Sequence, residues 1–147
     1  MTYECRSSGS KSKCFARSRD GCDQEVMQAL VTAGAMVASA DGVVAPVERA
    51  ELANFIFQQG FVHSISLQEI AAAFDVRVQM LDDRNAANVI LDSLRPLAGL
   101  SLGSVVVRVA QRVAAADKII LERELQAINL IRLIMMELSA RRQRQNA

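Results

Sequence analysis

One pattern occurs twice in this chain of 147 residues and constrains its fold more than any other feature. Residues 38–48 read ASADGVVAPVE, and residues 114–124 read AAADKIILERE. In each copy an Ala-rich stretch leads to an Asp, and a Glu follows seven residues after that Asp. Such a repeat indicates a unit used twice, in which the Asp lies at a turn and the Glu lies in the first turn of the next helix.

The composition favours helices. The chain contains two prolines and seven glycines, whereas Ala, Leu, Val and Ile are abundant. No segment shows sustained apolar–polar alternation, and the VVVRV run at 105–109 lies in an Ala-rich context that outweighs its strand propensity. We expect one all-α domain of about six to seven helices, with two helix–Asp–helix hairpins around a central pair of helices. Apolar spacing and stop signals place the helices at 24–40, 46–59, 67–80, 84–95, 102–116 and 121–140.

Capping signals mark the helix ends in the first hairpin. Asp23 is the expected N-cap of the first helix, and Gly42 suits the left-handed backbone that closes many helices. Pro46 fits the first turn of the second helix, where a missing N–H has no cost. With Ala45 at the N-cap, Glu48 takes the third helical position, as in a capping box.

Similar signals mark the middle of the chain. Ser66 and Glu69 have the spacing of a full capping box, which predicts a helix from residue 67. Asp82 and Asp83 are expected to cap the following helix, and Ser101 the one after it. We therefore interpret Asp82 and Asp83 as solvated capping residues and not as ligands.

Charge divides the chain into three parts. Residues 1–22 contain five basic and two acidic residues, and residues 141–147 contain three basic residues and no acidic one. Residues 23–140 contain nine basic and fourteen acidic residues. These boundaries predict a disordered basic N-terminal tail, a helical domain and a basic C-terminal tail. An acidic domain in a chain with only 4% aromatic residues argues against nucleic-acid binding.

No motif indicates catalysis. Cys5, Cys14 and Cys22 lie in the N-terminal tail without a CxxC pair, so they are interpreted as incidental thiols of a protein in the reducing cytoplasm. His63 is the only histidine, which excludes multi-histidine zinc sites. Residues 99–103 follow no strand and lack the Lys-Ser or Lys-Thr of a phosphate-binding loop. We therefore expect that the protein is not an enzyme.

The last predicted helix carries more apolar residues than one buried face needs. One set, at helical spacing, is expected to face the core: Leu121, Leu125, Ile128, Ile131, Met135 and Leu138. A second set lies outside this stripe: Leu130, Leu133, Ile134 and Met136. The second set is either buried as well or forms a face for a partner or a dimer. The arginines that follow would allow at most weak peripheral contact with anionic lipid: Arg141, Arg142 and Arg144.

The two Asp–Glu pairs have two interpretations. In the first, Asp41 and Asp117 bond neighbouring backbone N–H groups in turns, and Glu48 and Glu124 stabilise helix N-termini. In the second, the four carboxylates come together and bind a divalent cation, Ca²⁺ or Mg²⁺, which take oxygen ligands. No loop has the EF-hand pattern.

The repeated segments resemble the tellurite-resistance TerB family. The resemblance covers residues 24 to about 136, and it rests on three segments: residues 37–43 with Glu48, residues 109–117 with Glu124, and FVHSISLQEIAAAF at residues 61–74. It implies an all-α fold with internal pseudo-twofold symmetry. It also implies a cytoplasmic bacterial protein linked to tellurite resistance and wider stress responses.

The resemblance further implies a site and partners. Family members have been proposed to bind divalent metal through acidic surfaces, which correspond here to Asp41, Glu48, Asp117 and Glu124. They are thought to act near the inner face of the membrane with a membrane-spanning TerC-like protein and calcium-binding TerD-like proteins. The chain departs from the family pattern at Lys118, where Gly is usual. The expected function is a non-enzymatic stress-response adaptor, and the alternative is a metal-free helical scaffold for protein–protein interaction.

Overall fold

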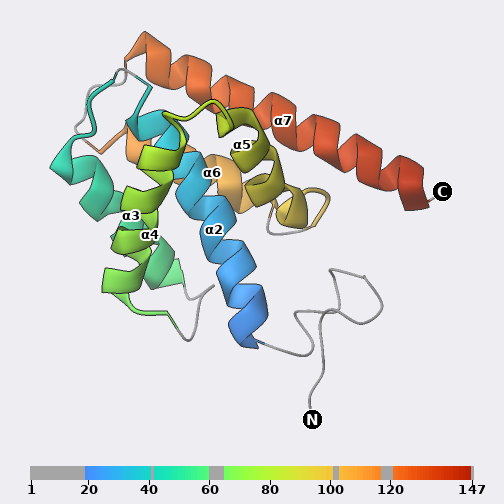
Figure 1. Cartoon of the computed structure of the whole chain (residues 1–147), viewed down its shortest axis with the longest axis horizontal. Helices are drawn as coiled ribbons and strands as arrows, with labels where there is room; N and C mark the ends of the chain where they lie inside the picture. The colour runs from blue at the N-terminus through green and yellow to red at the C-terminus, as the bar shows by residue number, and fades with distance from the viewer. Residues whose placement is uncertain (1–18, 41, 60–64, 101–102, 117–120, 147) are drawn as a thin grey trace.

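The computed structural model describes residues 19–40, 42–59, 65–100, 103–116 and 121–146. These residues form six α-helices and one 3-10 helix and contain no strand, so the predicted all-α class is confirmed (Figure 1). The elements in chain order are α2 (Arg19–Ala38), α3 (Pro46–Gln59), α4 (Leu67–Met80), α5 (Ala86–Leu94), η2 (Arg95–Leu97), α6 (Gly103–Ala114) and α7 (Glu122–Asn146).

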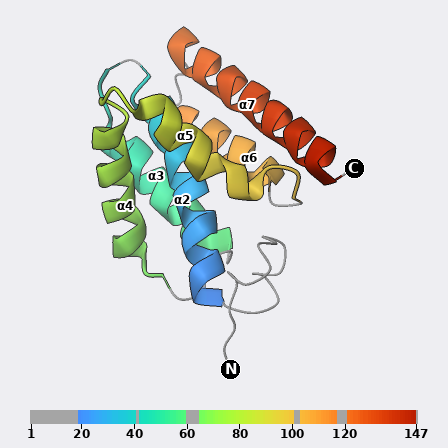
Figure 2. The ribbon, with the colours of Figure 1, turned by 45° about the vertical axis from the view of Figure 1, so that its right-hand side comes forward.

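Helix α2 lies at the centre of the fold and contacts every other helix (Figures 1 and 2). Every residue from Ala29 to Ala38 is buried, as expected for a helix that is apolar on all sides. Small residues let neighbours approach closely: a Cβ atom added at Gly34 would lie 2.5 Å from Cδ1 of Leu52 on α3. The prediction of a central helix pair at 67–80 and 84–95 is therefore wrong, because α4 and α5 pack on the outside of α2.

The two predicted hairpins pack as a related pair. The first helices of the hairpins, α2 and α6, pack on each other. The second helix of each hairpin packs on the first helix of the other, so that α3 contacts α6 and α7 contacts α2. A twofold axis through the α2–α6 contact would produce this pattern, which agrees with the predicted pseudo-twofold arrangement.

Local signals predicted several helix boundaries correctly. Helix α3 spans the predicted residues and begins with Pro46. Helix α4 begins at Leu67 behind a full capping box: the Ser66 hydroxyl accepts from the Glu69 N–H, and the Glu69 carboxylate accepts from the Ser66 N–H. The run at 105–109 is part of α6, as expected from its Ala-rich context.

The predicted start of the first helix is wrong. Helix α2 begins at Arg19, so Asp23 lies inside the helix, where it is buried, and does not cap it. A local capping preference is worth about 1 kcal/mol, and the packing of a central helix can exceed it. Residues 19–22 thus belong to α2 and not to the predicted disordered tail, whose remaining residues, 1–18, lie outside the described part of the chain.

The predicted caps of the fourth helix are also wrong. Helix α5 begins at Ala86, behind Asn85, which makes no side-chain capping bond. The Asp83 carboxylate instead accepts from the N–H of Arg84 at 2.6 Å. Asp and Asn readily bond their own local backbone in turns, and this competes with capping. Ser101, the predicted cap of α6, lies outside the described residues.

The predicted core-facing side of the last helix is confirmed from Ile128 onward and is wrong in the first turn. Leu121 and Leu125 are exposed, whereas the buried side consists of Glu124, Ile128, Ile131, Met135 and Leu138. The helix also continues beyond residue 140 to Asn146, so most of the predicted C-terminal tail is helical. In the described part of the chain, no helix is long and apolar enough to cross a membrane.

Candidate functional site at the hairpin turns

Glu48 lies in the first turn of the second helix of the first hairpin. It is the third residue of α3, and only 2% of it is exposed. Its Oε1 accepts a hydrogen bond from the N–H of Ala45 at 2.9 Å. The carbonyl of Ala45 accepts in turn from the N–H of Glu48 at 3.0 Å. The carboxylate therefore folds back onto the residue before its own helix.

Glu124 repeats this arrangement in the second hairpin. It is the third residue of α7, and only 1% of it is exposed. Its Oε1 accepts from the N–H of Leu121 at 3.0 Å, and the carbonyl of Leu121 accepts from the N–H of Glu124 at 3.0 Å. The repeated Glu of the sequence thus performs the same backbone contact in both copies.

These two glutamates supply one half of a capping box without the other half. A full box pairs the glutamate with a Ser or Thr hydroxyl, but Ala45 and Leu121 have no side-chain acceptor. The two carboxylates lie at the N-terminal ends of α3 and α7, where the helix dipole is positive. In contrast, the carboxylate in the full capping box, that of Glu69, is exposed. Both contacts fit the first interpretation of the sequence, in which the repeated glutamates stabilise helix starts.

The described ends of both hairpins lie at one end of the molecule. In Figures 1 and 2 the C-terminal ends of α2 and α6 and the N-terminal ends of α3 and α7 gather there. Gly42 has a φ of +88°, the left-handed backbone predicted for the first turn. Asp41 and Asp117 lie outside the described residues. Within the described ranges, no group of three or more His, Cys, Asp and Glu side chains is placed to hold a metal ion.

Apolar side chains are also exposed at this end. Val43 is 71% exposed, Val47 is 45% exposed and Leu121 is 40% exposed. The exposed Glu122 lies beside Leu121 in the sequence. We call residues 42–47 together with residues 121 and 122 the hairpin end. The hairpin end therefore presents both apolar and acidic side chains to the surface.

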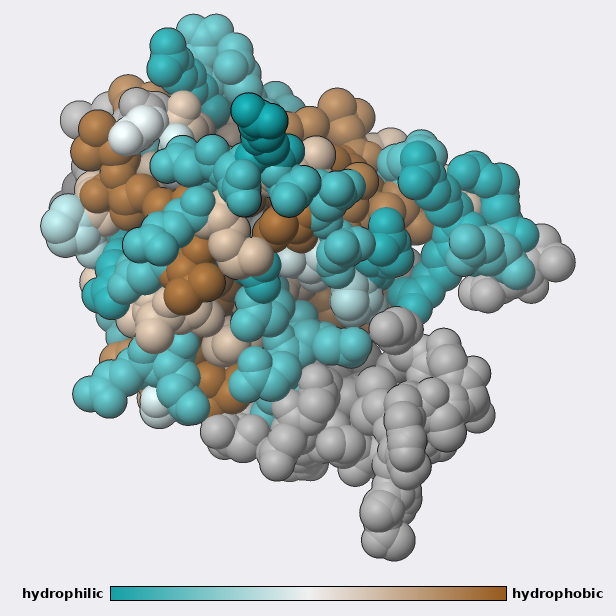
Figure 3. Space-filling model, viewed as in Figure 1, coloured by the Kyte–Doolittle hydropathy of each residue, from teal (hydrophilic) through white to brown (hydrophobic). Residues whose placement is uncertain are grey.

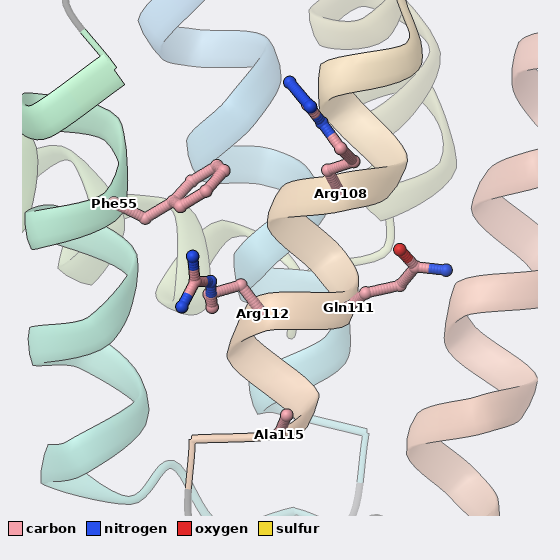
Figure 4. A pocket seen from close by; sticks show the side chains of 5 residues that line it. All are labelled: Phe55, Arg108, Gln111, Arg112 and Ala115. Atoms are coloured by element: carbon pink, nitrogen blue, oxygen red, sulfur yellow. The ribbon is translucent and has the colours of Figure 1, made fainter.

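A polar pocket of about 440 Å³ lies between α3 and α6 (Figure 4). The guanidinium carbon of Arg112 lies 5.1 Å from the centre of the Phe55 ring, and Arg112 also pairs with Glu51 at 3.5 Å. Figure 4 shows the Phe55 ring between the two helices and Gln111 projecting toward α7. Arg112 of α6 thus contacts two side chains of α3, Phe55 and Glu51, across this pocket.

A second pocket, of about 500 Å³, contains a guanidinium that the sequence did not single out. Arg77 of α4 donates to Gln28 Oε1, whereas its buried Nε has no acceptor. Burial lowers the pKa of Arg77 because it removes water from the guanidinium. Arg77 lies between Val76 and Val78 of a predicted helix and belongs to no motif, so no local signal could have identified it.

The arginines after residue 140 are engaged with the protein. Arg142 Nη1 donates to the carbonyl of Ala98, and Arg141 and Arg144 both pair with Glu137, at 3.0 and 3.7 Å. These contacts offset part of the positive charge on which lipid contact would depend. Peripheral membrane contact by this segment stays a prediction.

Comparisons with known proteins found no match to this chain. No protein-family model matches the chain, and no curated protein or solved structure matches it. The resemblance to the TerB family therefore depends on the three sequence segments that carry it.

Proposed function

We propose that this chain is a TerB-like stress-response adaptor without enzymatic activity, and that it contacts a protein partner through the hairpin end. The observation that carries the proposal is the pair of equivalent helix starts, in which Glu48 and Glu124 make the same backbone contact. This contact fixes the starts of α3 and α7, which lie at one end of the fold. Two helix starts fixed in this way are a suitable platform for residues that bind a partner.

The chemistry of the hairpin end suggests the kind of partner. Val43, Val47 and Leu121 offer apolar contact, and Glu122 adds negative charge. A partner surface with apolar and basic residues would be complementary. By the family resemblance, the partner would be a TerD-like or TerC-like protein, and the complex would form in the cytoplasm near the inner face of the membrane.

A binding measurement with a purified TerD-like protein tests this proposal. Val43→Asp combined with Val47→Asp should weaken binding at least about tenfold, because it places charges in an apolar contact. Val76→Asp on α4 is a matched control, since Val76 is equally accessible at 55% exposure but lies elsewhere. Equal binding of the hairpin-end variant and the wild type would refute the proposed surface.

A second candidate function is binding of a divalent cation at the hairpin turns. It is favoured by the burial of two carboxylates, Glu48 and Glu124, which follow Asp41 and Asp117 by seven residues in the sequence. Thermal unfolding with Ca²⁺, Mg²⁺ or Mn²⁺ tests it, because a ligand at 100 times its dissociation constant adds about 2.7 kcal/mol of stability. A shift that disappears on combining Asp41→Asn with Asp117→Asn would support a cation site. An absence of any shift would leave the metal-free adaptor.

A further inference from the structure

Helix α7 has an exposed seam on the side opposite the core. The residues of this outer seam follow at spacings of four and three: Glu122, Gln126, Asn129, Leu133, Met136, Ala140 and Arg144. This spacing is that of a helix that packs along a second helix. Leu133 is 62% exposed and Met136 is 67% exposed, and Leu130 beside them is 49% exposed. The middle of the seam is therefore apolar, and its two ends carry opposite charges.

The two hairpins differ in what covers their second helices. Helix α3 contacts α2, α6 and also α4, whereas the main contacts of α7 are with α2 and α6 alone. In Figures 1 and 2, α7 runs along one edge of the molecule, and in Figure 3 hydrophobic side chains reach the surface along it. Within the described chain, the outer seam thus lacks the third helix that α3 has.

We propose that a second copy of this chain covers the outer seam, with the two α7 helices antiparallel and a twofold axis at Leu133. Leu133 then meets its own counterpart, and Leu130 lies opposite Met136 of the second copy. Such an interface is self-complementary, as a twofold dimer requires. It shares Glu122 with the hairpin end, but its centre at Leu133 lies on another part of α7, and it does not depend on the proposed partner.

The charges on the seam select the antiparallel arrangement. Glu122 and Arg144 lie eleven residues before and after Leu133, which is about 16 Å in each direction along the helix. One twofold axis therefore brings Glu122 opposite Arg144 of the second copy at both ends. A parallel arrangement would instead place Glu122 on Glu122 and Arg144 on Arg144, which is unfavourable. The antiparallel helix dipoles add to this preference.

The existing contacts of Arg144 do not prevent this pairing. Its ion pair with Glu137 is 3.7 Å long, and both side chains are more than half exposed. An exposed pair of this kind contributes little to stability. Glu137 also keeps its shorter pair with Arg141 when Arg144 turns toward the second copy.

Sedimentation velocity of the full chain over about a hundredfold range of concentration tests the proposal. The wild type should dimerise, and Leu133→Glu should weaken the dimer at least about tenfold, because it places two carboxylates on the axis. Val76→Glu is the matched control and should leave the dimer unchanged. A monomeric wild type, or equal effects of the two variants, would overturn the proposal.

Charge reversal tests the arrangement itself. Glu122→Arg and Arg144→Glu should each weaken the dimer, and their combination should restore it. Failure of the combination to restore the dimer would overturn the antiparallel pairing. The unfolding midpoint of each variant, measured at a concentration where all are monomeric, checks that the fold is intact. A monomeric wild type that still binds a TerD-like protein would refute the dimer and leave the adaptor function standing.

Discussion

The buried glutamate at the start of α7 should be worth far more than an ordinary capping residue. Glu124→Ala removes the hydrogen bond to the Leu121 N–H, and a hydrogen bond to a charged group contributes about 1.5–3 kcal/mol. It also removes one methylene group from a side chain that is 1% exposed, at a cost of about 0.8 kcal/mol. Allowing for relaxation of the site, we expect a loss of about 2–4 kcal/mol in the free energy of unfolding.

Two further variants separate the causes of this loss. Glu124→Gln keeps the size and an acceptor oxygen but removes the charge at the helix start, so it should cost only about 0.3–1 kcal/mol. Glu69→Ala removes the corresponding hydrogen bond from an exposed capping box and should cost about 1 kcal/mol. Urea unfolding followed by circular dichroism measures all three values. A loss for Glu124→Ala no larger than that for Glu69→Ala would refute the reasoning.

Three other changes have definite expected outcomes in the same unfolding assay. Gly34→Ala should destabilise the protein by about 1–3 kcal/mol, because the new Cβ meets the fully buried Leu52. This loss should outweigh the better helix propensity of alanine. A stabilised variant would show that the side chain of Leu52 can move away. Arg77→Met should leave stability unchanged or raise it by about 1 kcal/mol, because it removes a guanidinium whose buried Nε has no acceptor. A loss of stability above about 2 kcal/mol would contradict this expectation. Arg49→Ala breaks a two-bond contact with Asp75 between exposed side chains and should cost less than about 1 kcal/mol, with the difference shrinking in high salt.

The parts of the fold that the sequence predicted well depend on local chemistry. Pro46 has a fixed backbone angle that suits a first helical turn, and α3 begins there. Ser66 and Glu69 satisfy each other's backbone N–H groups, and α4 begins behind them. Such signals act within a few residues, so they do not depend on what packs against the helix. The same holds for the contact of Glu48 with Ala45, which was predicted from spacing alone.

The errors concern choices that tertiary packing decides. Asp23 has the chemistry of an N-cap, but α2 extends past it because the helix is central. The predicted inner stripe of the last helix included Leu121 and Leu125 because both are apolar. The structure turns Glu124 inward instead, since its carboxylate bonds the backbone there. The prediction missed the burial of this charged side chain, because a rule that places all charges outside cannot predict it.

The capping glutamate and the outer seam lie on opposite sides of α7. Glu124 lies on the buried side with Ile128 and Ile131, and Leu133 and Met136 lie on the exposed side. Glu122 and Arg144 stand at the two ends of this exposed side. The first hairpin has the same glutamate in Glu48, but there α4 lies against the second helix. The duplicated cap thus accounts for the likeness of the two hairpins, and the missing third helix beside α7 accounts for the surface that a second copy would cover.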